Sequence, residues 1–355
     1  MTLRSQRTYN FDMAILKRLV PVLPLLLAIS FVAPAQNPPA PPPKAQQPGQ
    51  DQTQQPPLKV TSGLVHLVAA VSDRRHNFVT DLEKQDFKIL EDGKPQTIQF
   101  FGRETDLPLR IAMLLDTSNS IRERLHFEKD AATDFLVNVI RRNKDMAFLM
   151  TFDNQPEIIQ DYTGDTGLIT EAIQKQRAGG GTSFNDAIYM AAQKLGKAPL
   201  PEGTDQEVRR VLVVFSDGED NLSDRALSDA IEMAERSEVA VYSISTSTEW
   251  LATDTTDRPR KLFKTPGDKI LETLAEETGG RVFFPYKVDD LAVSFQDIGT
   301  ELRSQYFIAY APTNPMTNGQ YRKIQVDVDR KGLVVRTRKG YYAVAPAAGP
   351  YTKSQ

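Results

Sequence analysis

The sequence predicts an α/β fold in which a doubly wound, mostly parallel sheet is flanked by β-strand segments that form a small β-sandwich. Between residues 105 and 305, short apolar runs alternate with helical patterns, as expected for parallel strands covered by helices. Strand-like runs with turn signals lie on either side, at residues 58–104 and 306–345. Each flanking segment is too short for a sandwich of its own, so we expect the two to pair, with the α/β domain inserted between them.

The flanking segments contain hairpin chemistry. Strands are predicted at residues 64–72, 86–91 and 97–101, with Asp92-Gly93 as a hairpin turn. The C-terminal segment contains the strand-like runs YFIAYAP, YRKIQVDV, LVVRTR and GYYAV. Residues 346–355 are expected to be a frayed tail.

The α/β domain is predicted from apolar runs and helical patterns in turn. Runs such as RIAMLL and RVLVVF are continuously apolar, as in parallel strands buried on both faces. Gly279-Gly280 follows a helical pattern and predicts its C-cap. The predicted strands are 110–115, 146–152, 210–215, 239–245 and 281–284, and the predicted helices are 120–140, 168–174, 184–195, 224–236, 269–278 and 288–304.

Composition narrows the classes of function. The 355 residues carry 43 Lys and Arg against 46 Asp and Glu, and a net charge of −3 argues against a nucleic-acid-binding surface. The absence of cysteine excludes disulfides, zinc ribbons, thiol nucleophiles and a cysteine-linked lipid anchor. With only three histidines, His66, His76 and His126, a site built on several imidazoles is not expected.

The N-terminal residues have the pattern of an export signal. A basic pair at residues 17–18 precedes an apolar run at 19–32 and the small residues Ala33-Pro34-Ala35. We expect a cleaved signal peptide at residues 1–35, because the run is short for a retained membrane anchor and contains two prolines. Residues 36–57 are rich in Pro and Gln, which predicts an extended linker. The chain is therefore expected in the periplasm, at the cell surface or in the medium.

Three polar segments lie where a predicted strand ends or a helix begins. They are DTSNS at 116–120, GGGTS at 179–183 and SDG at 216–218. In an open α/β sheet these ends meet in the crevice at the carboxyl edge. Together they offer two carboxylates and at least three hydroxyls, a set of hard oxygen ligands that suits Mg²⁺, or Mn²⁺ or Ca²⁺.

This pattern resembles the metal-ion-dependent adhesion site (MIDAS) of von Willebrand factor type A domains, in which D-x-S-x-S is followed by a Thr after glycines and an Asp after an apolar strand. The segments DFKILEDGKPQTIQFF, LRSQYFIAYAPTN and RKGYYAV also resemble an exported bacterial subfamily, the acidobacterial-type VWFA-related proteins. The resemblance covers nearly all of the chain after the linker. It implies a von Willebrand factor A, Rossmann-like fold.

The resemblance also implies which residues hold the metal: Asp116, Ser118, Ser120, Thr182 and Asp217. The two serines would bind the ion directly, the threonine in the ligand-bound state, and the two aspartates directly or through water. Neutral hydroxyls leave a bound cation much of its charge, so an Asp or Glu carboxylate from a protein partner can complete its shell. We therefore expect a non-enzymatic binding or adhesion module. The resemblance further implies that the last helix, residues 288–304, slides when the site is filled.

Two other functions stay open. An envelope or extracellular scaffold would make its contacts through the sandwich, independently of the metal. A metal-dependent hydrolase would need a general base near the ion. The sequence offers no well-placed histidine, no Gly-x-Ser-x-Gly elbow and no Walker loop, so this function is the remoter alternative.

Single residues also have more ordinary explanations. A serine at a helix start, such as Ser118, is usually an N-cap. Asp220 and Asp224 are expected to be surface or capping residues rather than ligands, and His126 a surface residue. Trp250 either anchors a partner or covers the edge of the sheet.

Overall fold

The computed structural model describes residues 63–103, 107–203, 207–247, 264–285 and 288–343. The predicted signal peptide, linker and tail, together with Trp250, lie outside these residues. No helix in the described part of the chain is long and apolar enough to cross a membrane.

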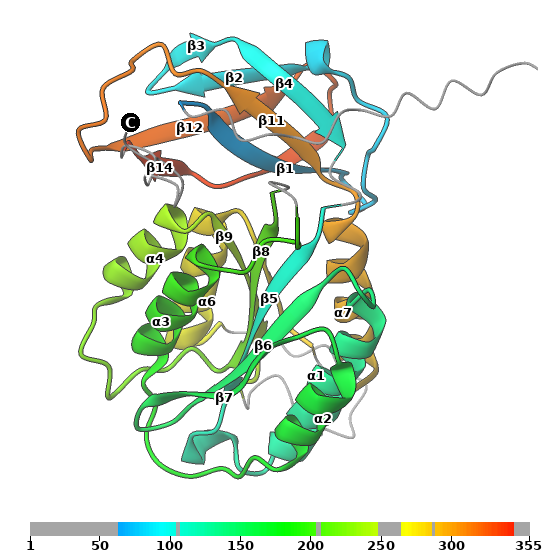
Figure 1. Cartoon of the computed structure of the whole chain (residues 1–355), viewed down its shortest axis with the longest axis vertical. Coiled ribbons are helices and arrows are strands. Elements are labelled where there is room, and N and C mark those ends of the chain that lie inside the picture. Colours follow the sequence, from blue (N-terminus) through cyan, green and yellow to red (C-terminus); the bar gives the residue numbers. More distant parts are fainter. Residues whose placement is uncertain (1–62, 104–106, 204–206, 248–263, 286–287, 344–355) are drawn as a thin grey trace, which may run out of the picture. The chain divides into compact units, whose positions relative to one another are not determined.

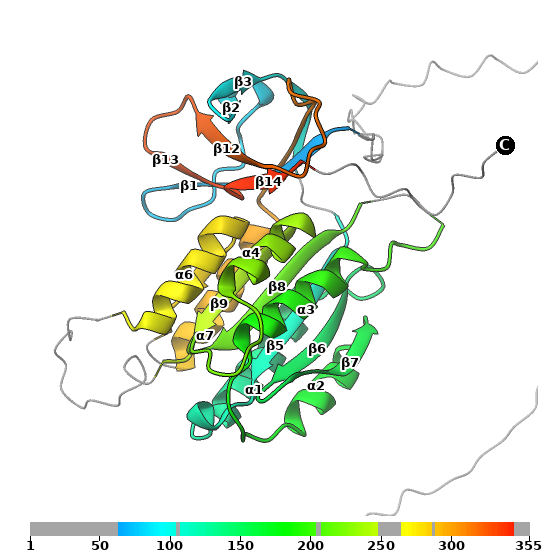
Figure 2. The ribbon, with the colours of Figure 1, turned by 90° about the vertical axis from the view of Figure 1, so that its left-hand side faces the viewer.

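A six-stranded sheet forms the centre of the inserted domain, in the order β10-β9-β8-β5-β6-β7 (Figures 1 and 2). Every neighbouring pair is parallel except β6 and β7, which are antiparallel. β5 has a central place and is buried at every position, because helices cover both faces of the sheet. The strands are β5 (Leu109–Asp116), β6 (Met146–Phe152), β7 (Pro156–Thr163), β8 (Arg209–Ser216), β9 (Val239–Ser245) and β10 (Arg281–Phe283).

Helices cover the two faces of this sheet (Figure 1). α1, α2 and α7 pack on one face through one hydrophobic cluster, and α3, α4 and α6 pack on the other through a second. Successive residues of β5 alternate between them, with Met113 in the first cluster and Leu114 in the second. The predicted doubly wound α/β class is confirmed. The helices are α1 (Leu125–Val139), α2 (Thr166–Gln174), α3 (Phe184–Gly196), α4 (Leu227–Arg236), α6 (Pro266–Thr278) and α7 (Val288–Leu302).

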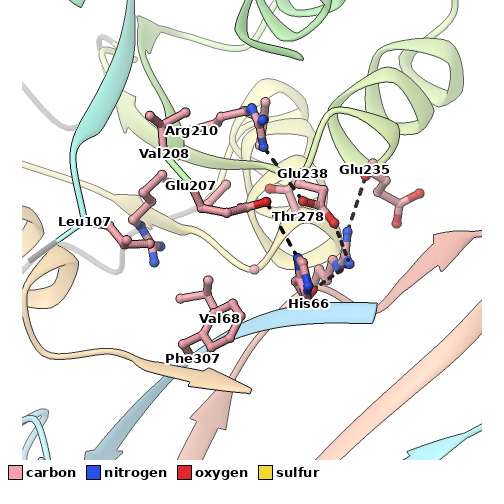
Figure 3. A pocket seen from close by; sticks show the side chains of 15 residues that line it. His66, Val68, Leu107, Glu207, Val208, Arg210, Glu235, Glu238, Thr278 and Phe307 are labelled. Carbon is pink, nitrogen blue, oxygen red and sulfur yellow. Dashed lines mark hydrogen bonds and ion pairs between the residues drawn. The ribbon is translucent and has the colours of Figure 1, made fainter. Parts of the chain in front are cut away.

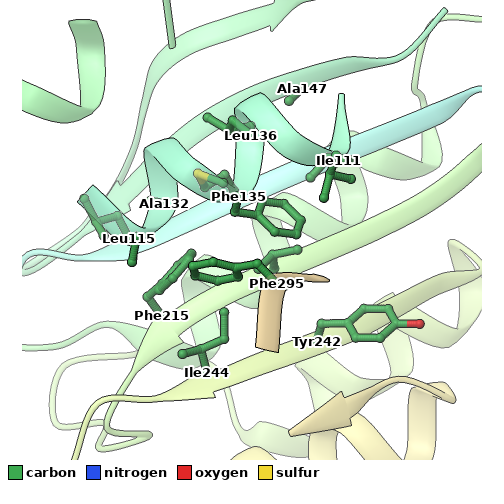
Figure 4. Packing of buried hydrophobic residues seen from close by; sticks show 14 of the residues in the cluster. Ile111, Leu115, Ala132, Phe135, Leu136, Ala147, Phe215, Tyr242, Ile244 and Phe295 are labelled. Atoms are coloured by element: carbon green, nitrogen blue, oxygen red, sulfur yellow. The ribbon is translucent and has the colours of Figure 1, made fainter. Parts of the chain in front are cut away.

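Aromatic contacts hold α7 in the first cluster (Figure 4). The ring of Phe295 on α7 lies 5.4 Å from that of Phe135 on α1 and 5.9 Å from that of Phe215 on β8, measured between centroids. Edge-on and tilted contacts of this kind contribute about 0.5–1.5 kcal/mol each beyond their buried area. The last helix of the domain is thereby packed against the first helix and against the strand that leads to Asp217.

Two four-stranded antiparallel sheets form the β-sandwich, in the orders β13-β1-β11-β4 and β14-β12-β2-β3. Strands from the two ends of the sequence pair directly, β1 with β11 and β2 with β12. Both sheets contribute to one core, for example through Leu67, Ile89, Tyr306 and Ile324. The strands are β1 (Val65–Asp73), β2 (Phe87–Glu91), β3 (Lys94–Gln96), β4 (Ile98–Arg103), β11 (Tyr306–Tyr310), β12 (Tyr321–Val328), β13 (Leu333–Arg336) and β14 (Gly340–Tyr342).

Three elements differ from the prediction. After the Asp92-Gly93 turn it is the short β3 that returns along β2, whereas β4, predicted at 97–101, pairs with β11 in the other sheet. β7 is missing from the predicted strands, because this edge strand begins with Pro156 and is only partly buried, so it lacks a continuous apolar run. The helix predicted at 120–140 is divided into a short 3₁₀ helix, η2 (Asn119–Ile121), and α1, which begins at Leu125. Ile121 and Leu125 are both buried and lie four residues apart, as they would in one continuous helix. The apolar pattern alone therefore does not reveal the break between η2 and α1.

A buried carboxylate lies where α4 meets the sandwich. Glu235 is 4% exposed and accepts a hydrogen bond of 3.1 Å from the hydroxyl of Tyr321 on β12. Burial raises the pKa of Glu235 from its ordinary value of 4.5 to about 7, and the nearby charge of Glu277 acts in the same direction. The folded state therefore keeps this proton to a higher pH than the unfolded state does.

The raised pKa predicts a pH-dependent loss of stability. As the pH rises from about 4.5 to about 7, the unfolded chain releases the Glu235 proton first, so the free energy of unfolding falls. Glu235→Gln removes this loss, and its advantage over the wild type should grow to about 1–3 kcal/mol above pH 7. Urea unfolding of both proteins at pH 5 and pH 8 measures this difference in the free energy of unfolding. Glu232→Gln, at a more exposed position of the same helix that pairs with Arg236, is the control. An advantage for Glu235→Gln that does not change with pH would contradict the prediction.

Candidate metal centre

The first polar loop begins with a buried carboxylate at the end of β5. Asp116 is fully buried, and its Oδ1 accepts a hydrogen bond of 2.8 Å from the backbone N–H of Ser118. Its Oδ2 accepts one of 2.8 Å from the hydroxyl of Ser216, the last residue of the neighbouring strand β8. The carboxylate is therefore held from two sides, and the ends of β5 and β8 are joined through it.

Ser118 and Ser120 bring their hydroxyls together. Ser118 precedes η2, but its side chain makes no capping hydrogen bond, so the ordinary N-cap explanation does not account for it. Its Oγ instead lies 2.9 Å from the Oγ of Ser120. Two neighbouring ligands of an octahedral Mg²⁺ with bonds of about 2.1 Å lie about 3 Å apart. The spacing of the two hydroxyls thus suits one such ion.

The glycine-rich loop is fastened to the first loop by backbone hydrogen bonds. The N–H of Gly179 donates to the carbonyl of Thr117 at 2.8 Å, and the N–H of Asn119 donates to the carbonyl of Gly180 at 3.2 Å. Gly180 has a φ of +80°, a conformation that glycine adopts at little cost. These contacts bring the segment that carries Thr182 beside the loop that follows Asp116.

The third loop is fastened to the second through Asn221. The side-chain oxygen of Asn221 accepts from the N–H of Thr182 at 2.9 Å, and the N–H of Asn221 donates to the carbonyl of Thr182 at 3.0 Å. Thr182 is 3% exposed and Asp217 is 8% exposed. The three loops thus form one hydrogen-bonded set at the carboxyl edge of the sheet, and all five predicted ligands lie on it.

The start of α6 fixes the position of the Asp217 loop. Thr265 caps this helix, and its Oγ1 accepts from the N–H of Asp268 at 3.0 Å, with Pro266 in the first turn. The cap places Gly267 against the third loop. A Cβ on Gly267 would lie 2.1 Å from the backbone oxygen of Asp217, so no side chain fits there.

Negative charge accumulates around these loops. Burial raises the pKa of Asp116 to about 6, and the charge of Asp217 adds to the effect. Glu128 on α1 is also buried, and neither carboxylate oxygen has a hydrogen-bond partner among the described residues. Burial raises the pKa of Glu128 well above its usual range, the charge of Asp116 adds to this, and Arg124 opposes it. A divalent cation would offset this charge, so the residues fit a metal ion.

Several supporting residues are not among the predicted ones. They are Ser216, Asn221, Glu128 and Asn154, whose Oδ1 accepts from the N–H of Gly181 at 2.9 Å. Glu128 had a signal in the sequence, since an acidic residue three positions after Leu125 falls within the apolar stripe of the helix. The other three act across loops that are distant in the sequence.

The remaining residues singled out in the sequence lie outside the metal centre. Asp220 accepts hydrogen bonds from the backbone N–H groups of Asn185 and Ser223, at 3.2 and 3.0 Å. His126 has an exposed side chain and lies 3.1 Å from Asp130 on the same helix. Both placements agree with the surface and capping roles expected for them.

The fold and the polar loops define a Rossmann-like domain with a ligand site at the carboxyl edge of its sheet. Residues 111–219 match the family model of the von Willebrand factor type A domain. The chain therefore contains a von Willebrand factor type A domain, a class of protein-interaction module. No curated protein matches the sequence significantly.

Solved structures with similar backbones share little sequence with the chain. An aerotolerance-related membrane protein from Bacteroides fragilis is 19% identical, with a TM-score of 0.41 over 55% of this chain and 98% of its own. A von Willebrand factor type A protein from Catenulispora acidiphila is 13% identical, with a TM-score of 0.45 over 79% and 73%. Proximal thread matrix protein 1 from the mussel byssus, with a zinc-occupied MIDAS motif, is 16% identical, with a TM-score of 0.42 over 59% and 50%.

Because α6 packs tightly against the Asp217 loop, we predict that even a methyl group added at Gly267 destabilises the folded protein. Gly267→Ala should lower the free energy of unfolding by at least about 2 kcal/mol, because the new methyl group overlaps backbone atoms that cannot rotate away. Gly179→Ala is the matched control, since a Cβ at that position meets nothing within 4 Å. Chemical denaturation measures both variants. Equal losses in the two variants would show that this contact is not tight.

Proposed function

We propose that the chain is an exported, non-enzymatic binding module that captures a carboxylate of a protein partner through a divalent cation. The cation is Mg²⁺, with Mn²⁺ or Ca²⁺ as substitutes, held by Asp116, Ser118, Ser120, Thr182 and Asp217. The observation that carries the proposal is the hydrogen-bonded set of three loops, which gathers two carboxylates and three hydroxyls at one edge of the sheet.

Each residue contributes to binding in a different way. When bound, the cation supplies an electrophilic centre with a coordination position for a ligand from outside. The hydroxyls of Ser118 and Ser120 donate neutral oxygen ligands, which leave that centre strongly positive. The carboxylate of Asp116 is held in place by Ser118 and Ser216, so it needs no rearrangement to bind. A partner's Asp or Glu then supplies the charge that the hydroxyls lack.

Export rests on the sequence. The pattern at residues 1–35 and the Pro/Gln-rich stretch at 36–57 support a signal peptide and a spacer. The flanking segments resemble the exported acidobacterial-type VWFA-related proteins, and we place the chain in that group. Its site would then face partners in the periplasm, at the cell surface or in the medium.

A hydrolytic function has less support from the site. Metal-assisted hydrolysis needs a general base that reaches the attacking water. The charge of Asp116 acts on the carboxylate of Glu128, but Glu128 is 1% exposed and is poorly placed to reach a water molecule from solvent. The exposed His126 pairs with Asp130 instead. We therefore favour binding over catalysis.

Metal binding is the first test. Isothermal titration of Mg²⁺ and Mn²⁺ into the EDTA-stripped chain should show one ion per chain, and Asp116→Ala and Asp217→Ala should each weaken binding by at least about tenfold, because each removes one of two carboxylates. Glu219→Gln removes a charge from the same loop at an exposed position, and should bind normally. Equal binding by all four proteins would rule out the proposed ligands.

Partner capture tests the second half of the proposal. A protein exported by the same cells should bind the immobilised chain in the presence of Mg²⁺. It should no longer bind in EDTA, and it should not bind the immobilised Asp116→Ala variant. The carboxylate that completes the shell should be a single Asp or Glu of the partner, so its amide variant should also fail to bind. A partner that is kept in EDTA and by Asp116→Ala, but lost when the sandwich surface is altered, would favour the scaffold function instead.

A further inference from the structure

A second cluster of metal-ligating side chains lies at the other edge of the central sheet. His66 on β1, Glu207 just before β8 and Glu238 just before β9 line one cavity (Figure 3). β8 and β9 begin here, at Arg209 and Val239, whereas the Asp116 site lies where the parallel strands end. The cavity joins the first strand of the sandwich to the amino ends of two central strands, and the function proposed above does not use it.

The three side chains have the spacing of ligands around one ion. One ligand atom from each lies within 4.8 Å of the others. Nδ1 of His66 is 3.9 Å from Oε1 of Glu207, too far for a hydrogen bond. Ligands of a tetrahedral Zn²⁺ with bonds of about 2.1 Å lie about 3.4 Å apart. Small rotations of the side chains would therefore close the three atoms onto one ion.

Neighbouring groups already hold two of these side chains in place. Nη2 of Arg338 donates to the backbone oxygen of His66 at 2.7 Å and to Oε1 of Glu238 at 3.3 Å. The imidazole also packs against the ring of Phe307, with centroids 5.4 Å apart. Ligating side chains in metal proteins are commonly fixed by such outer contacts. The backbone of Glu238, in the turn between α4 and β9, has a φ of +53°, a left-handed conformation that costs free energy for a residue with a Cβ.

The charges around the cavity are unevenly compensated. Arg338 and Arg210 both approach Glu238, at 3.3 Å from one carboxylate oxygen and 3.8 Å from the other. Glu207 has no hydrogen bond to any described residue; its carboxylate faces the imidazole of His66 at 3.9 Å and also lies within the influence of the Arg210 charge. Burial raises the pKa of Glu207, and the charge of Glu238 adds to the effect. Arg209, Arg210 and Arg338 also line the cavity, and two of them approach Glu238, so Glu207 is the less compensated of the two carboxylates.

We propose that His66, Glu207 and Glu238 form a second metal site, selective for a transition metal of the Zn²⁺ class, which ties the sandwich to the α/β domain. An imidazole with two carboxylates suits Zn²⁺, whereas Mg²⁺ prefers oxygen ligands and water. A water molecule would complete the tetrahedral shell. The bound ion links β1 to the segments that precede β8 and β9. This proposal stands independently of the Asp116 site.

The test uses Zn²⁺ itself, in a chain whose Asp116 site has been removed. Asp116→Ala should still bind one Zn²⁺ by isothermal titration, and adding His66→Ala or Glu207→Gln should weaken this binding at least tenfold. Adding His126→Ala should change nothing, since this exposed histidine lies elsewhere, beside Asp130. Co²⁺ provides a second readout, because its visible absorption bands report tetrahedral binding and should disappear with His66→Ala.

Two controls keep the outcome interpretable. Circular dichroism and thermal unfolding in EDTA should be the same for the parent and for His66→Ala and Glu207→Gln, so that lost binding cannot be attributed to lost folding. Asp217→Ala serves as a second parent if Asp116→Ala is unstable. Zn²⁺ binding that is absent from both parents, or unchanged by His66→Ala and Glu207→Gln, would overturn the proposal.

Discussion

The buried carboxylate of Asp116 is the constraint around which the three polar loops are arranged. A carboxylate removed from water is costly unless hydrogen bonds or opposite charges compensate it. The N–H of Ser118 and the hydroxyl of Ser216 provide part of this compensation, yet the pKa still rises to about 6. Glu128 is also buried, without a hydrogen-bond partner in the described part of the chain, so burial and the charge of Asp116 make its ionisation costly as well. A bound divalent cation would supply the missing compensation, which is why we propose one at these loops.

The sheet supplies this arrangement because parallel strands deliver their polar ends to one edge. β5 is buried along its whole length. Asp116, the site residue that this strand contributes, is therefore its last residue, at the carboxyl end. β8 ends beside it at Ser216, and the start of α6 presses on the next residues through Gly267. Stability and site geometry are therefore carried by the same contacts, and a change that loosens the strand ends also displaces the ligands.

The sequence predicts most clearly the parts of the fold that are fully buried. β5 and β8 are continuous apolar runs, and the polar residues that follow them mark the edge of the sheet. β7 escapes prediction because an edge strand that is half exposed has no such run. The five predicted ligands lie on the three joined loops, but the contacts that join them, such as those of Asn154 and Asn221, depend on register between distant segments. No local pattern encodes that register.

The way α7 ends bears on whether it can slide. Glu301, in its last turn, is fully buried, accepts a hydrogen bond of 2.7 Å from Tyr242 on β9 and pairs with Arg336 on β13. Breaking a buried ion pair by separating its partners typically costs several kcal/mol, because each charge is left uncompensated. The helix also leads within a few residues into β11, which is fixed between β1 and β4. A sliding motion of the whole helix would have to break these contacts. Any displacement of α7 is therefore easier at its Val288 end than at the end that leads into the sandwich.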